Sequence, residues 1–274
     1  MNDVITRTEL LLPGPAQALG GLLDVPVPDL DTDGLPLLWH WIYLLDRPRQ
    51  ADLGPDGHPV RGALPAPPGP GRRMWAGGLV RTSARLRCGQ TATRRSRVLS
   101  IQDKAGRSGL LTFVTVGHEI VQHGCVVVEE QQEIVYRQTT VQDTWPPSDG
   151  QVSPAADDEW AIEVSPTLLF RFSALTYNSH RIHYDRDYAG DVEGYPGLLT
   201  HGPLQALAMA EAARSAGYCW GRDGGLEFRY RLESPLFDHQ GMIVKAVFGH
   251  ETTTAVRDIY GRRTARGTLR SRSQ

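Results

Sequence analysis

The chain has 274 residues, which is enough for one large domain or for two of ordinary size. Apolar residues make up 40% and charged residues 22% of it, values that exclude a disordered, collagen-like or membrane-embedded chain. The formal net charge of −2 leaves no general excess of positive charge, so we expect no nucleic-acid partner.

The cysteines and the first residues indicate a reducing compartment. Cys88, Cys125 and Cys219 are widely spaced and form no Cys-x-x-Cys pair, which argues against a disulfide framework and against a zinc site. Asp3 and Glu9 stand where a signal peptide would carry positive charge. The longest apolar run, residues 36–45, is about half of the ~20 residues that a membrane helix needs. We therefore expect a cytoplasmic protein with no membrane partner.

The first half of the chain predicts one helix followed by strands. Residues 35–46 (LPLLWHWIYLLD) predict a buried helix, and we interpret Trp39, His40 and Trp41 on it as core residues. A loop dense in proline and glycine follows at residues 54–71. Four segments rich in Val, Ile, Thr, Leu or Tyr then predict an antiparallel meander over residues 74–86, 91–102, 109–122 and 125–136.

The second half repeats this plan. Residues 145–158 (WPPSDGQVSPAADD) predict a linker, and we place the domains at residues 1–147 and 148–274. Residues 200–217 form the strongest helical pattern, with Pro203 near the start and Gly217 at the end. Short strands are predicted over residues 226–232, 242–250, 252–260 and 263–269. The repeated plan indicates an internal duplication, although the sequence echo between the stretches from Val80 and Tyr230 is faint.

A group of polar residues that can bind or transfer protons precedes the strongest helix: Tyr177, Asn178, His180, Arg181, His183, Tyr184 and Asp185. Exposed loops are often equally polar, but this group stands close to a helix that begins at His201-Gly202-Pro203. The amide of Gly202 has no partner inside the helix, lies at the positive end of the helix dipole and carries no side chain that would block a ligand. Such an amide suits a reaction that develops an oxyanion, for example enolate formation from a thioester.

The same segment resembles the signature of the MaoC-like hydratase and dehydratase family, which has the hot dog fold. The signature reads Gly-Asp-x-Asn-Pro-Ile-His-x-Asp, and residues 177–185 read YNSHRIHYD, followed in register by Tyr188-Ala189 and His201-Gly202. The resemblance implies an α+β double hot dog, each half an antiparallel sheet wrapped around a central helix. It matches His183 to the catalytic histidine and Gly202 to the glycine of the oxyanion hole, whereas Asn178 replaces the catalytic aspartate.

The run Tyr-Asn-x-His-Arg-Ile-His-Tyr is similar to one branch of the family, which includes mesaconyl-C4-CoA (3-methylfumaryl-CoA) hydratases and itaconyl-CoA hydratases. The first half adds similar segments, PLLWHW at residues 36–41, LGPDGHP at 53–59, RRMWAGG at 72–78 and FVTVGHEI at 113–120. This resemblance implies a hydro-lyase that converts itaconyl-CoA or mesaconyl-C4-CoA to citramalyl-CoA. It also implies a homodimer that needs no cofactor, because coenzyme A is part of the substrate.

Hydration of an enoyl thioester needs a base for water, donors for the enolate oxygen and an acid for the α-carbon. We expect His183 to be the base, because an unperturbed imidazole has a pKa of about 6.5. Asn178 would orient the water or the thioester, and the Gly202 amide would hold the thioester oxygen. Arg181 either binds the second carboxylate of the acyl group or forms a surface ion pair with Asp185 or Asp187.

Further residues are candidates for substrate binding, each with an ordinary alternative. His180, His201 and Tyr177 can contact substrate, but structural roles are favoured. Arg95 and Arg97 share one face of a predicted strand, within a stretch of ten basic residues at 72–107 that are opposed by Asp103 alone. They bind the phosphates of coenzyme A or belong to a solvated sheet surface.

The spacing His180-x-x-His183-x-Asp185 can also be read as a metal site, but such short matches are common, and we expect no metal. Other enoyl-CoA hydratases or 3-hydroxyacyl thioester dehydratases, hot dog thioesterases and non-catalytic acyl-CoA-binding proteins remain alternatives. No Gly-x-Ser-x-Gly elbow, P-loop or dinucleotide fingerprint is present in the sequence.

Overall fold

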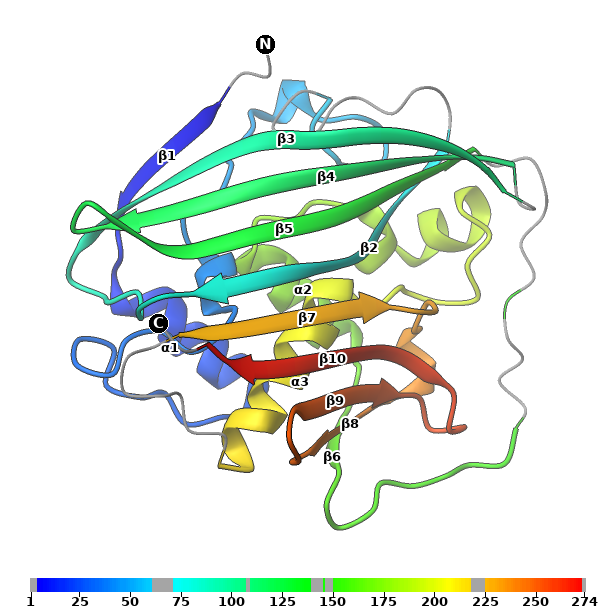
Figure 1. The fold of residues 1–274 in the computed structure, drawn as a ribbon. Helices are drawn as coiled ribbons and strands as arrows, with labels where there is room; N and C mark the ends of the chain where they lie inside the picture. The colour runs from blue at the N-terminus through cyan, green and yellow to red at the C-terminus, as the bar shows by residue number, and fades with distance from the viewer. Residues whose placement is uncertain are drawn as a thin grey trace.

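The structure is a computed structural model that describes residues 4–60, 71–106, 109–138, 145, 150–217 and 225–272. Its first half contributes the strands β1 (Ile5–Leu10), β2 (Gly71–Thr82), β3 (Thr91–Gly106), β4 (Gly109–Gln122) and β5 (Cys125–Gln138). Its second half contributes β6 (Trp160–Ile162), β7 (Leu226–Leu232), β8 (Met242–Val247), β9 (Thr252–Arg257) and β10 (Arg263–Ser271). Together they form one antiparallel sheet in the order β1-β3-β4-β5-β2-β7-β10-β9-β8-β6 (Figure 1).

The two halves of this sheet have the same strand order. The first half reads β1-β3-β4-β5-β2 and the second, from its outer edge inward, β6-β8-β9-β10-β7. The halves join where β2 pairs antiparallel with β7, with Val80 opposite Phe228. The predicted strands are confirmed with shifted ends, but β2 pairs with β5 and β7 and not with its successor β3. This shared order is the one that an internal duplication predicts.

Three α-helices lie on one face of the sheet, α1 (Pro13–Leu23), α2 (Pro166–Leu175) and α3 (Gly202–Ser215) (Figure 1). The helix predicted at residues 200–217 is confirmed as α3, which packs on β8, β9 and β10. The pattern did not reveal α1 or α2. The Ser165 hydroxyl caps α2 by accepting the amide of Leu168 at 3.2 Å, with Pro166 in the first turn.

The helix predicted at residues 35–46 is wrong. The segment is buried, but its only helical turn is the short 3₁₀ helix η1 (Trp39–Ile42). Leu38 and Leu44 have φ values of 68° and 55°, which no right-handed helix accommodates. Side-chain bonds hold this irregular path, because Trp39 Nε1 donates to Glu211 at 2.8 Å while His40 and Trp41 bond to the carboxylate of Glu130.

Several predictions fall on parts of the chain that the structure does not describe. The domain boundary between residues 147 and 148 and most of the loop at 54–71 stay predictions for this reason, as does the state of Cys219. Cys88 and Cys125 are free thiols. Among the described helices, none has the length and apolar character that crossing a bilayer would require.

Candidate active site

A cavity of about 1020 Å³ lies between the sheet of the first half and the polar segment of the second. Residues of both halves line it, among them Trp41, His58, Arg73, Asn178, His183 and Gly202. Within the part of the chain that the structure describes, no long helix fills this space as α3 fills the corresponding space in the second half. The site is therefore built from two segments that are more than a hundred residues apart in the sequence.

The chain reverses directly after α2, and this reversal places the polar segment at the cavity. Tyr177 has a φ of 52°, and its exposed side chain lines the cavity. The side-chain oxygen of Asn178 then accepts the backbone N–H of His180 at 3.1 Å, the short-range bond typical of asparagine in turns. The 3₁₀ turn η3 (Arg181–His183) follows and carries His183 into the cavity wall.

His183 is held as a neutral base. Its Nδ1 lies 2.7 Å from the carbonyl oxygen of Leu199. A carbonyl only accepts, so Nδ1 carries the hydrogen and Nε2 presents its lone pair. Burial lowers the pKa of His183 to about 4, although the Leu199 hydrogen bond opposes this shift. Near neutral pH the imidazole is uncharged and able to accept a proton.

His201 supports His183 from outside the cavity wall. The two rings stack with centroids 3.6 Å apart, and His201 Nε2 lies 2.8 Å from the hydroxyl of Ser173. Burial, with His183 and His180 nearby, keeps the pKa of His201 well below its ordinary value. The structural role favoured for His201 therefore agrees with its position, whereas His180 lines the cavity itself.

The amide of Gly202 lies where the sequence predicts it. Gly202 is the first residue of α3, Pro203 follows it in the first turn, and both line the cavity. The positive end of the helix dipole and an amide without an intrahelical partner can receive a developing oxyanion. His183 and Gly202 thus bring a base and an anion-binding amide to one cavity.

Arg181 does not line the cavity. Its Nε and Nη2 lie 2.9 and 2.7 Å from one carboxylate oxygen of Asp185, and its guanidinium stacks on Tyr188 at 4.1 Å. Another nitrogen donates to the carbonyl of Pro55 at 3.1 Å. Of the two interpretations of Arg181, the structure shows the ion pair with Asp185, because this geometry already uses its forked donors.

Arg95 and Arg97 also lie away from the large cavity. Side chains alternate along β3, so that Arg94 faces the large cavity while Arg95 and Arg97 face the opposite side of the sheet. There they line a smaller hollow of about 310 Å³, in which Arg97 lies 3.7 Å from Glu119. Binding of coenzyme A phosphates by this pair stays a prediction.

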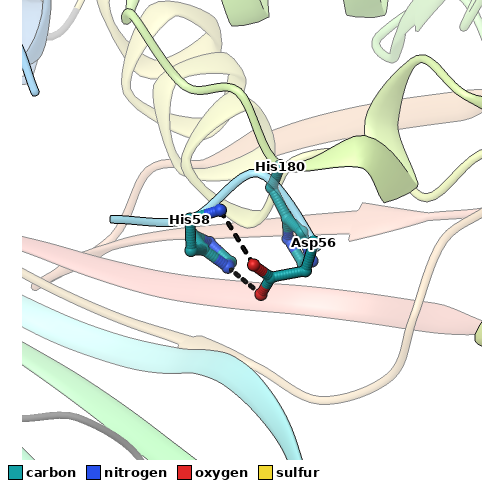
Figure 2. Close-up of side chains that lie close together, drawn as sticks. All are labelled: Asp56, His58 and His180. Carbon is teal, nitrogen blue, oxygen red and sulfur yellow. Dashed lines mark hydrogen bonds and ion pairs between the residues drawn. The ribbon is translucent and has the colours of Figure 1, made fainter. Parts of the chain in front are cut away.

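The site contains residues of the first half to which sequence reasoning gave no role. Asp56 and His58 are two residues apart in the LGPDGHP segment. Asp56 accepts both the ring Nδ1–H of His58 at 2.9 Å and its backbone N–H at 3.0 Å (Figure 2). The ring of His58 lies 3.9 Å from that of His180. The only signal in the sequence was the resemblance of the LGPDGHP segment, because nothing local shows which distant segment it meets.

The residues around His58 include a group that could hold a metal ion. Asp56, His58 and His180 offer ligand atoms within 4.8 Å of one another, whereas Asp185 of the sequence-based metal pattern is paired with Arg181. Two nitrogens and one oxygen are a donor set that zinc accepts. Because Asp56 already accepts the Nδ1–H of His58, the arrangement is that of a hydrogen-bonded carboxylate–imidazole pair.

Residues 38–238 match the family model "Hydroxyacyl-thioester dehydratase type 2". Over 206 residues, 74% of this chain and 71% of the relative, the chain is 48% identical to a protein of Chloroflexus aurantiacus named mesaconyl-C(4)-CoA hydratase.

Solved structures agree in fold. A MaoC-like dehydratase from Phytophthora capsici has a TM-score of 0.70 at 15% identity, covering 100% of this chain and 96% of the other. A Mycobacterium tuberculosis protein described as having a double hot dog fold has a TM-score of 0.53 at 13% identity, covering 98% and 94%. The predicted α+β double hot dog fold is confirmed.

Proposed function

Because the chain belongs to the hydroxyacyl-thioester dehydratase type 2 family, we propose that it is a hydro-lyase for a short, branched, dicarboxylic enoyl-CoA thioester. The proposed reaction adds water reversibly to mesaconyl-C4-CoA or itaconyl-CoA and forms citramalyl-CoA. The observation that carries the proposal is the meeting of His183 and Gly202 in one cavity, in a chain 48% identical to a protein named for this activity.

His183 and the Gly202 amide have different roles in the reaction. His183 Nε2 accepts a hydrogen bond from the attacking water, because its Nδ1 is occupied by Leu199. As the water oxygen bonds to the β-carbon, negative charge develops on the thioester oxygen, and the Gly202 amide stabilises this enolate. Asn178 has no proton-accepting carboxylate, and its side-chain oxygen already receives the amide of His180. Asn178 therefore orients ligands and takes no proton.

Arg73, and not Arg181, is the residue that we propose for the second carboxylate. Arg73 lies on β2, lines the cavity and is half-buried. Burial lowers its pKa, and among the described residues no carboxylate is within ion-pair distance of its guanidinium. In 3-methylfumaryl-CoA the carboxylate is attached to the carbon that receives the water. A cation that lines the same cavity as His183 is therefore suited to this substrate.

The assay that tests the function distinguishes hydration from thioester cleavage. The purified protein is incubated with mesaconyl-C4-CoA, itaconyl-CoA and crotonyl-CoA, and both citramalyl-CoA and free thiol are quantified. We expect citramalyl-CoA without thiol release. Thiol release without hydration would identify a thioesterase, and saturable binding with neither product would identify an acyl-CoA-binding protein. The cytoplasmic location, the homodimer and the absence of a separate cofactor stay predictions.

A further inference from the structure

We infer that Asp56 and His58 form a proton-transfer pair of this site, supplied by the first half in place of the family aspartate that Asn178 replaces. The inference rests on the proposed hydration reaction and adds two residues to it. His58 lines the same cavity as Asn178, His183 and Gly202, and would act directly on the attacking water. Asp56 is a positioning residue that acts through His58.

The loop that carries the pair is docked on the catalytic segment. The hydroxyl of Ser179 donates to the carbonyl of Gly57 at 2.6 Å, and the backbone N–H of Arg181 donates to the carbonyl of Asp56 at 2.9 Å. The approach is so close that a Cβ on Gly57 would lie 1.9 Å from the carbonyl oxygen of Ser179. The position of His58 in the cavity is therefore fixed by the residues next to His180.

The hydrogen bond of Asp56 defines which nitrogen of His58 is basic. A carboxylate only accepts, so Nδ1 of His58 carries the hydrogen and Nε2 presents a lone pair. Burial lowers the pKa of His58, an effect that Arg73 reinforces and that Asp56 and Glu193 oppose. Burial would raise the pKa of Asp56, but the hydrogen bonds from His58 keep it below its ordinary value. The pair is thus a neutral imidazole on an ionised carboxylate.

The two bases of the cavity differ in how they can carry a proton. His183 is supported by a neutral carbonyl, and the imidazolium that it would become lies among the rings of His180 and His201. His58 is supported by the negative charge of Asp56, which stabilises an imidazolium directly. Charge that develops during proton transfer is therefore better accommodated on His58.

In the hydration step, His58 takes a proton from water and later returns it to the substrate. One O–H bond of the water breaks, its proton moves to Nε2 of His58, and the oxygen bonds to the β-carbon while His183 accepts the other O–H as a hydrogen bond. The electron pair of the double bond moves to the thioester as an enolate on the Gly202 amide. Nε2 of His58 then returns the proton to the α-carbon, which restores the neutral imidazole and completes the addition of one water.

The test compares His58→Gln and Asp56→Asn with the wild type on mesaconyl-C4-CoA between pH 5 and pH 8. His58→Gln should lower kcat by about 10² to 10⁴-fold. Asp56→Asn should lower kcat by roughly tenfold or more and move the acid limb of kcat/KM to lower pH, because a base works deprotonated and Asp56 raises the pKa of His58. The groups around His58 that also bear on this limb are His180, His183, Arg73 and Glu193.

Matched controls are His250→Gln and Asp158→Asn, which change the same residue types on the surface. All variants are checked for unchanged thermal unfolding. The inference is overturned if His58→Gln or Asp56→Asn keeps more than a third of the wild-type kcat. It is also overturned if Asp56→Asn lowers kcat but leaves the acid limb of kcat/KM in place. Neither result would affect the proposed function. Activity that a chelator abolishes and Zn²⁺ restores would also overturn the inference, in favour of a metal at Asp56, His58 and His180. A wild type that hydrates none of the esters would overturn the proposed function and the inference together.

Discussion

The two halves of the molecule have one strand order and two different interiors. In the second half, α3 covers β8, β9 and β10, and Leu207 of the helix and Val256 and Ala265 of the strands are completely buried. Five alanines in α3 allow this close contact, because small side chains bring the helix axis near the sheet. In the first half, the irregular run of residues 35–46 stands beside the sheet, and a cavity of about 1020 Å³ is left.

The sheet surface differs accordingly. On the first half, Glu130 is buried in the wall of the cavity and accepts hydrogen bonds from His40 at 3.0 Å, Trp41 at 2.9 Å and Gln132 at 2.8 Å. Burial would raise the pKa of Glu130, but the hydrogen bond and charge of His40, the nearby His118 and the Gln132 hydrogen bond keep it at about 2. An apolar helix packed here would leave such groups without partners. One half of the duplicated plan therefore has a packed core, whereas the other encloses a binding space.

The largest effect is expected from the catalytic signature of the second half. His183→Ala should lower kcat/KM for mesaconyl-C4-CoA by about 10² to 10⁴-fold, because the water loses its acceptor. The steady-state rate of citramalyl-CoA formation measures this, with His250→Gln as the surface control. A variant that keeps more than a tenth of wild-type hydration would show that His183 is not required, and that the first half alone activates water.

The contact between the halves can be broken at one glycine. Gly57→Ala places a methyl group against the carbonyl of Ser179 and forces an L side chain to a φ of 86°, so the loop must leave its docked position. We expect kcat to fall by roughly 10²-fold, as misplacement of about 1 Å does elsewhere. Gly124→Ala is the matched control, because Gly124 has a φ of 77° with nothing within 4 Å. Equal activity of the two variants would contradict the role of the docked loop.

Substrate choice is expected to depend on the first half. Arg73→Met should raise the KM for mesaconyl-C4-CoA by roughly 10 to 100-fold, since a hydrogen bond to a charged group contributes about 1.5–3 kcal/mol. Crotonyl-CoA lacks the second carboxylate and serves as the internal control, whose KM should change little. A parallel rise for both esters would assign Arg73 to packing or to the coenzyme A moiety.

The smallest effect is expected on the face of the first half that points away from the cavity. If Arg95 and Arg97 bind no phosphate, their joint replacement by Glu leaves the KM for coenzyme A esters within about twofold, as is usual for solvated charges. Arg47 and Arg49 line the large cavity and are exposed, and their joint replacement by Glu should raise this KM several-fold. The reverse outcome would move the phosphate site to the outer face and support the original prediction.

The sequence was informative wherever local patterns carry the structure. A segment rich in Val, Ile, Thr and Leu with glycine at its boundaries predicted β4 at its observed ends, and Pro203 with Gly202 predicted the start of α3. The helix prediction for residues 35–46 was wrong, because an apolar run shows burial but not conformation. Here distant side chains such as Glu130 and Glu211 hold an irregular path. The sequence did not predict the helix α1, because the prolines and glycine at its start are residues typical of loops.

By itself, the sequence determined the paired architecture, the helix start at Gly202 and the candidacy of His183, since periodicity, capping and a spaced motif are properties of neighbours along the chain. The tertiary structure decided which residues share the cavity. It paired Arg181 with Asp185, turned Arg95 and Arg97 to the outer face, and brought Asp56 and His58 to the catalytic segment. These outcomes depend on hydrogen bonds between segments far apart in sequence, and no local pattern encodes such contacts.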